Sequence, residues 1–97
     1  MVGKFNVRAL IRSRDRDKIR PVVERLFAGG RVSISAERKD EIAAEAVLSG
    51  TSAKDVNRSI LSELRRFEKR TTMRSEWTYG SSTESYFDYV LKKKAGP

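Results

Sequence analysis

Basic side chains form the clearest chemical pattern in this sequence. Lys and Arg number 21 against 13 Asp and Glu, which gives a formal net charge of +8. Such a balance favours binding to a polyanion, either nucleic acid or an acidic protein surface. Most of the excess lies in two segments. The residues that we predict to contact phosphates are Arg8, Arg12, Arg14 and Arg16 in the first segment, and Arg58, Arg65, Arg66, Lys69 and Arg70 in the second.

The spacing within the second segment suits a helix with a basic face. Arg58, Arg65 and Lys69 follow one another at intervals of seven and four residues, which places them opposite the apolar residues of the same helix. A phosphate backbone could follow such a stripe, although a solvated helix face would show the same pattern. Contacts of this kind carry little sequence information, so we expect limited sequence readout.

Aromatic residues matter because single-stranded nucleic acid is held by rings that stack on bases within a basic groove. The rings gather near the C-terminus at Trp77, Tyr79, Tyr86, Phe87 and Tyr89. If Met73, Trp77 and Tyr79 share an inner face with Phe87, Tyr89 and Leu91, these residues form core, and Tyr86 points outward as the stacking candidate. The segment Arg31–Ser35 has no ring where a conventional RNA-recognition motif would place one.

The sequence contains few residues of the types that commonly act in catalysis. The sequence has no cysteine and no histidine, which removes thiolate nucleophiles, the usual zinc ligands and the commonest general base. The close acidic pairs Asp15/Asp17 and Asp40/Glu41 have the composition of a helix cap and a hairpin turn. We therefore expect no enzymatic activity, no catalytic residues, no metal site and no cofactor.

The basic residues must be positioned by strands and helices that the apolar pattern predicts. Alternation indicates a strand over 4–12, and a 3.6-residue period indicates a helix from Asp17, the expected cap, to the stop at Gly29-Gly30. Two more alternating runs, 31–37 and 42–48, predict a hairpin. Ser52 then begins a helix whose apolar stripe is Ala53, Val56, Ile60, Leu64 and Phe67.

A second, aromatic hairpin is predicted over 72–79 and 86–91, with a turn at 80–82. The order of elements predicts an α+β class and a ferredoxin-like β-α-β-β-α-β antiparallel sheet, with both helices on one face and a C-terminal aromatic hairpin. We expect a single domain over 1–91 and a basic, flexible tail over 92–97.

The outer face of this sheet is the predicted partner surface. Leu10, Ala43 and Val47 should point away from the helices, among polar neighbours. Small apolar residues in this setting suit packing against another sheet. These three residues are therefore the expected interface of a homodimer or of a complex with another subunit.

One helix also resembles a known family. The run Ser52-Ala53-Lys54-Asp55-Val56-Asn57-Arg58-Ser59-Ile60-Leu61-Ser62-Glu63-Leu64-Arg65-Arg66 resembles the final helix of the small dimerising subunit of KEOPS, the complex that helps to make threonylcarbamoyladenosine on tRNA. The resemblance covers about the first 70 residues, and the aromatic hairpin departs from it. It implies a non-catalytic dimer whose sheet and second helix contact partner proteins and tRNA.

Two functions are compatible with these patterns. The first is a non-enzymatic, basic, cytoplasmic domain that binds nucleic acid, RNA rather than DNA, mainly through phosphates, and that could act as a subunit of an RNA-related complex. The alternative is a homodimeric assembly protein that binds an acidic protein partner. No apolar run approaches the roughly 18 residues of a membrane span, so we expect no membrane partner.

Overall fold

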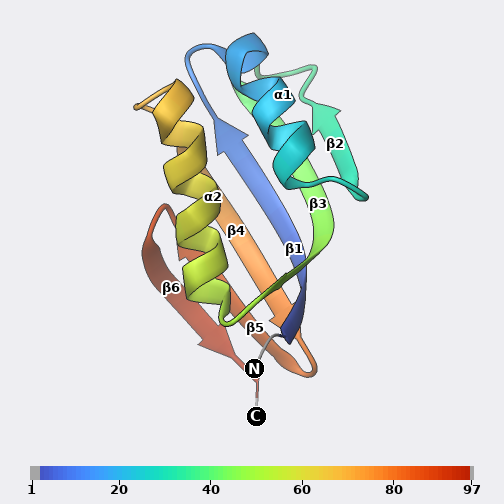
Figure 1. The fold of residues 1–97 in the computed structure, drawn as a ribbon. Coiled ribbons are helices and arrows are strands. Elements are labelled where there is room, and N and C mark those ends of the chain that lie inside the picture. The colour runs from blue at the N-terminus through green and yellow to red at the C-terminus, as the bar shows by residue number, and fades with distance from the viewer. Residues whose placement is uncertain (1–2, 97) are drawn as a thin grey trace.

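Two helices and six strands make up the part of the chain that the computed structural model describes, residues 3–96 (Figure 1). In chain order they are β1 (Gly3–Arg12), α1 (Arg16–Leu26), β2 (Arg31–Ile34), β3 (Glu41–Gly50), α2 (Ala53–Phe67), β4 (Thr72–Tyr79), β5 (Ser82–Phe87) and β6 (Val90–Ala95). Within residues 3–96, no helix combines the length and the apolar character that a membrane crossing requires.

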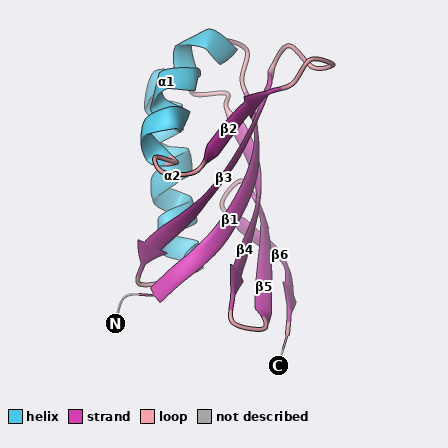
Figure 2. Ribbon diagram, turned by 90° about the vertical axis from the view of Figure 1, so that its right-hand side faces the viewer, coloured by secondary structure: helices cyan, strands magenta, loops and turns pink. Residues whose placement is uncertain are grey.

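The strands form one antiparallel sheet in the order β2-β3-β1-β4-β5-β6. Figure 2 shows both helices on the same side of this sheet, which leaves the other side bare. The predicted α+β class is confirmed. The predicted β-α-β-β-α-β order accounts for four strands and the predicted C-terminal hairpin for a fifth, and the sixth strand, β6, was not predicted.

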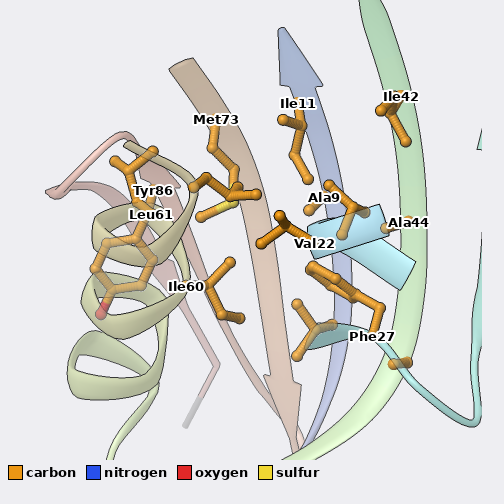
Figure 3. Close-up of a cluster of buried hydrophobic side chains, with 14 of the residues drawn as sticks. Ala9, Ile11, Val22, Phe27, Ile42, Ala44, Ile60, Leu61, Met73 and Tyr86 are labelled. Carbon is orange, nitrogen blue, oxygen red and sulfur yellow. The ribbon is translucent and has the colours of Figure 1, made fainter. Parts of the chain in front are cut away.

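The core lies between the helices and the inner face of the sheet (Figure 3). Strand alternation turns Val7 and Ile11 of β1 toward the helices, where they are fully buried. The helices contribute Ile19, Val23 and Phe27 from the α1 side and Ile60, Leu61 and Leu64 from α2. Burying one such side chain stabilises the fold by roughly 1.5–3 kcal/mol, so the two apolar stripes hold the helices on the sheet.

Local hydrogen bonds set where the helices begin. Ser52 caps α2 as predicted, since its hydroxyl accepts a hydrogen bond from the Asp55 amide at 3.1 Å. The predicted cap of α1 is wrong. Asp15 caps that helix by accepting from the Lys18 amide at 3.1 Å, and Asp17 lies in the first turn. Beyond α1, Gly29 has a φ of +85°, the left-handed backbone expected of the stop.

The C-terminal hairpin differs from the prediction because the chain turns once more. Asp88 adopts a φ of +54°, and the chain reverses there, before the predicted end of the strand at Leu91. Asp tolerates this conformation better than most residues. Residues 90–95 then form β6, so the predicted domain boundary after Leu91 falls inside a strand, and most of the predicted tail belongs to the sheet. Residues 1–2 and Pro97 lie outside the described part.

The predicted outward position of Tyr86 is also wrong. The β4–β5 register places Tyr86 opposite Ser75 and Phe87 opposite Arg74, and directly opposite residues share a face. Ser75 and Trp77 face the helices, so Tyr86 does too, at 3 % exposure and as a member of the buried cluster that Figure 3 shows. Phe87 and Leu91, predicted as core, are exposed, and Phe87 lies on the bare face. The inward positions of Met73, Trp77 and Tyr79 are confirmed.

Candidate nucleic-acid interface

Three connections of the chain meet at one end of the molecule. The β1–α1 connection contacts the β2–β3 connection, because the Ser13 amide donates to the Asp40 carbonyl at 2.9 Å. The Arg16 guanidinium donates to the carbonyls of Ser35 at 3.0 Å and Arg38 at 3.1 Å. The third connection, from α2 to β4, begins at this same end, where the end of α2 lies near the start of α1 (Figure 1). The fold thus brings together parts of both predicted basic segments.

A hollow of about 550 Å³ lies at the end of α2, and we call it the basic hollow. Its lining consists of Lys18 from α1 and the six residues 65–70, which are Arg65, Arg66, Phe67, Glu68, Lys69 and Arg70. Lys18, Arg66, Lys69 and Arg70 are all exposed, so their charges face solvent. The one acid in the lining, Glu68, accepts a hydrogen bond from the Arg70 amide at 3.2 Å. The hollow therefore presents an excess of positive charge.

Phe67 lies among these cations with 41 % of its surface exposed. The helical spacing predicts it as the last residue of the buried stripe, and that prediction is wrong. Leu64, one turn earlier, is fully buried, whereas α2 ends at Phe67 and leaves its ring partly exposed. An exposed ring within a basic hollow is the combination that holds an unpaired base.

Arg65 has a different setting from its basic neighbours. Its Nε donates to the Thr71 carbonyl at 2.9 Å, and one of its Nη atoms lies 3.3 Å from an Asp88 carboxylate oxygen. The guanidinium also lies over the Tyr89 ring, 5.1 Å from its centroid. These contacts join α2 to the β5–β6 turn, so Arg65 has a structural role whether or not it meets phosphate.

The other predicted phosphate contacts lie at different places on the surface. Arg14 is exposed at the end of the molecule where the three connections meet, and Arg58 is exposed on α2 outside the hollow. Arg12 lies 4.0 Å from Glu41, and Arg8 forms an ion pair of 3.3 Å with Glu45 on the bare face of the sheet. Only Arg65, Arg66, Lys69 and Arg70 of the predicted set line the basic hollow.

Tyr86 takes no part in this site. Its hydroxyl donates to Glu84 at 2.6 Å, and the Tyr79 hydroxyl donates to the other oxygen of the same carboxylate at 2.7 Å. Burial, together with the bond to Glu84, raises the pKa of Tyr86 above its usual range. The bond from Tyr86, helped by that from Tyr79, lowers the pKa of Glu84. This cluster fastens β4 to β5.

Sequence reasoning missed Lys18 and Phe67 as members of the candidate site. Lys18 comes close to the end of α2 only through the packing of the helices. The signal for Phe67 is visible in Arg65-Arg66-Phe67-Glu68-Lys69-Arg70, where one ring stands among four basic residues. The apolar period of the helix assigned that ring to the core instead.

Leu10, Ala43 and Val47 lie on the bare face of the sheet, as predicted. Leu10 is exposed, Val47 is 61 % exposed, and Ala43 is half-buried between strands β2 and β1. Their role as an interface stays a prediction.

Comparisons of the chain with protein-family models, curated proteins and solved structures find no match. The resemblance of α2 to the small KEOPS subunit therefore stays a prediction, and the function is inferred from the geometry of the site.

Proposed function

We propose that the protein is a non-enzymatic domain that binds single-stranded nucleic acid, RNA in preference to DNA, in the basic hollow. Lys18, Arg66, Lys69 and Arg70 would contact phosphates, and Phe67 would stack on one base. RNA is favoured because its loops and bulges offer unstacked bases next to a folded backbone. The proposal includes a ferredoxin-like assignment for the first four strands and a role within an RNA-related complex.

The observation that carries this proposal is the exposed Phe67 ring among four exposed cations. Arg65 and Arg66 lie in the last turn of α2, where a positive charge also stabilises a helix by opposing its dipole. Lys18, Lys69 and Arg70 lie outside that helix, and its dipole does not account for them. Phe67 keeps 41 % of its surface exposed, and base stacking on an exposed ring contributes about 1–3 kcal/mol.

Binding of this kind has a defined dependence on salt. Each phosphate contact on a single strand releases counterions, and log affinity falls with log salt by about 0.7 per contact. Four contacting cations predict a slope of about −3. Duplexes should bind more weakly than single strands at the same salt, because their bases are already stacked and cannot reach Phe67.

The test is fluorescence anisotropy with labelled single-stranded RNA, single-stranded DNA and duplex DNA at low salt. Lys69→Glu should weaken binding to all three. Its matched control is Lys54→Glu, which changes an exposed lysine in the first turn of α2, at the opposite end of the helix from the basic hollow. Phe67→Ala should reduce single-strand affinity about 5- to 150-fold, equivalent to the stacking energy, and leave duplex binding unchanged. Phe67→Leu keeps an apolar side chain without a ring and should behave like Phe67→Ala.

Two results would overturn the proposal. The first is the absence of binding to any of the three probes at micromolar protein and low salt, which would direct attention to an acidic protein as the partner of these cations. The second is equal weakening by Lys69→Glu and Lys54→Glu, which would show that net charge, and not the basic hollow, governs binding.

A further inference from the structure

The bare face of the sheet carries its side chains in regular rows across the strands. One row, which we call the charge row, alternates in sign over four strands: Arg31 on β2, Glu45 on β3, Arg8 on β1 and Glu76 on β4. It continues through Ser85 on β5 to Lys93 on β6. Arg8 thus lies between two carboxylates, and it forms an ion pair with Glu45 at 3.3 Å.

The neighbouring row is mostly apolar. This apolar row consists of Ser33, Ala43, Leu10, Arg74, Phe87 and Val90, in the order of the strands. Leu10, Phe87 and Val90 are exposed, and the Arg74 guanidinium lies over the Phe87 ring at 5.4 Å from the centroid. A hollow of about 680 Å³ opens here between Leu10, Phe87 and Lys92. Three exposed apolar side chains thus lie in one row, with Arg74 between Leu10 and Phe87, and a group of this kind indicates an interaction surface.

We propose that the partner of this face is a second copy of the chain, related by a two-fold axis that runs parallel to the strands above the gap between β1 and β4. Such an axis maps each row onto itself in reverse order, so β1 faces β4 of the second copy and β3 faces β5. Two sheets packed face to face hold their strands within about 30° of each other.

This arrangement pairs unlike charges and fits large side chains to small ones. Arg8 meets Glu76 of the second copy, and Glu76 meets Arg8, so two ion pairs form at the centre. Phe87 meets Ala43 of the second copy, where the methyl group leaves space for a ring. Arg31 and Lys93 meet only at the rim, where solvent screens their repulsion. The charges of the face are therefore complementary to the same face on another copy.

Other two-fold positions fit less well. An axis directly above β1 would place Arg8 on Arg8 and Glu45 on Glu76. An axis above the gap between β3 and β1 would pair Glu45 with Arg8 and Arg31 with Glu76, but it would leave Phe87 and Val90 uncovered. Pairing through the β6 edge is disfavoured because Lys92, Lys93 and Lys94 lie along that strand, and lysines on an edge oppose strand addition.

The size of the face suits a stable dimer. Six strands about 4.8 Å apart, over about seven residues at about 3.3 Å each, span roughly 650 Å² per copy. Two copies would bury roughly 1,300 Å², within the range of specific protein interfaces. An axis parallel to the strands also keeps the basic hollows of both copies at the same end of the dimer. The dimer does not depend on nucleic-acid binding, and its test uses protein alone.

Charge reversal with mixing tests both the face and the position of the axis. Arg8→Glu would set two carboxylates against each other at both central contacts of its dimer, and Glu76→Arg would set two guanidinium groups against each other there. Each variant alone should dissociate at least tenfold more readily than the unmodified protein. A mixture of the two should recover a dimer, because each contact then joins opposite charges. Analytical ultracentrifugation measures the masses, and circular dichroism confirms that each variant is folded.

Two further variants complete the design. Arg20→Glu makes the same charge change on the exposed side of α1, remote from the bare face, and should leave the dimer intact. Phe87→Ser removes the exposed ring without altering charge and should weaken the dimer at least tenfold, which keeps the test valid if a charge variant fails to fold.

Three results would overturn the proposal. Unmodified protein that stays at the mass of one chain at several hundred micromolar excludes the dimer. A dimer that survives Arg8→Glu and Phe87→Ser uses a different surface. If both charge variants are monomeric alone and stay monomeric when mixed, the axis above the gap between β1 and β4 is excluded, because that axis requires the mixture to recover a dimer. An axis above the gap between β3 and β1 would give this lack of recovery.

Discussion

The two faces of the sheet use the same strands in different ways. On the face toward the helices, Phe5 packs edge to face against Trp77 and Tyr79, with ring centroids 5.8 Å and 5.3 Å apart. On the bare face, the alternate residues are mostly charged or polar, and the exposed apolar side chains are Leu10, Val47, Phe87 and Val90. Because successive side chains of a strand point to opposite sides, one segment such as β4 packs one set of residues against the helices and leaves the other set on the bare face.

Polar groups also differ between the faces. The inner face buries a line of hydrogen bonds in which Trp77 Nε1 donates to the Ser75 hydroxyl at 2.9 Å and that hydroxyl donates to Asn57 Oδ1 at 2.6 Å. Asn57 Nδ2 then donates to the Asp88 carbonyl at 2.8 Å. Within residues 3–96, no buried side-chain nitrogen or oxygen lacks a partner. The bare face has solvent-exposed ion pairs instead. Removing a polar group should therefore cost far more on the inner face.

The largest expected effect comes from Trp77, the largest fully buried side chain. Trp77→Ala should lower the free energy of unfolding by about 3–5 kcal/mol, because it leaves a cavity beneath α2. Urea denaturation followed by circular dichroism measures this. Phe87→Ala is the matched change on the bare face and should cost less than about 1 kcal/mol in the monomer. Equal losses from the two variants would contradict the contrast between the faces.

Asn57 should produce the next largest effect. Asn57→Ala leaves the Ser75 hydroxyl and the Asp88 carbonyl without their partner, which predicts a loss of about 2–3 kcal/mol in the free energy of unfolding. Ser59→Ala is the control, an exposed change on the same helix. The double variant Asn57→Ala/Ser75→Ala should lose less unfolding free energy than the sum of the losses of the two single variants, because the two residues share one hydrogen bond. Additive losses would show that the line does not act as a unit.

Glu84 should make stability depend on pH. Its pKa is lower in the folded protein than in the unfolded chain, since the hydroxyls of Tyr86 and Tyr79 stabilise the carboxylate. The resulting stabilisation is complete above the unfolded value of about 4.3 and is lost as pH falls through the lower, folded value. Tyr86→Phe removes one of these hydroxyls, so the variant should have a lower unfolding free energy than the unmodified protein at neutral pH. This difference should shrink as the pH falls, because the unmodified protein loses the same stabilisation when Glu84 is protonated.

The control for this measurement is Tyr89→Phe, whose hydroxyl lies 3.2 Å from Ser62 Oγ rather than beside Glu84. Thermal melts between pH 7 and pH 3 compare the two variants. A deficit of Tyr86→Phe that stays constant across this range would show that the hydroxyl does not stabilise the charged form of Glu84.

The smallest effect belongs to Arg8 on the bare face. Arg8→Ala removes an ion pair between two side chains that are 74 % and 52 % exposed, and such pairs contribute about 0–1 kcal/mol. Its free energy of unfolding, measured in dilute protein, should differ from that of the unmodified chain by less than about 1 kcal/mol, with the difference falling further in high salt. A loss as large as that of Asn57→Ala would remove the distinction between the faces.

Local patterns determined much of the fold in advance. The alternation of Phe5, Val7, Ala9 and Ile11 predicted β1 and its buried side, and Ser52 predicted the start of α2. These features depend on neighbours within a few residues, namely the strand period and the cap hydrogen bond. The α+β class follows from the order of such elements. The inward positions of Met73 and Trp77 and the bare-face positions of Leu10 and Val47 were predictable for the same reason.

Tertiary structure alone decided which alternate set of β5 faces the helices and which ring reaches the candidate site. Alternation separates Tyr86 from Phe87 but does not orient them, because orientation depends on the register with β4 and on the turn at Asp88, which Asn57 and Met73 hold from distant elements. Phe67 carried the spacing of a core residue, yet its burial required a surface to cover the end of α2, and the packing of the helices left that end open beside Lys18. Period and composition are local properties of the chain, whereas coverage depends on the three-dimensional contacts between segments far apart in sequence.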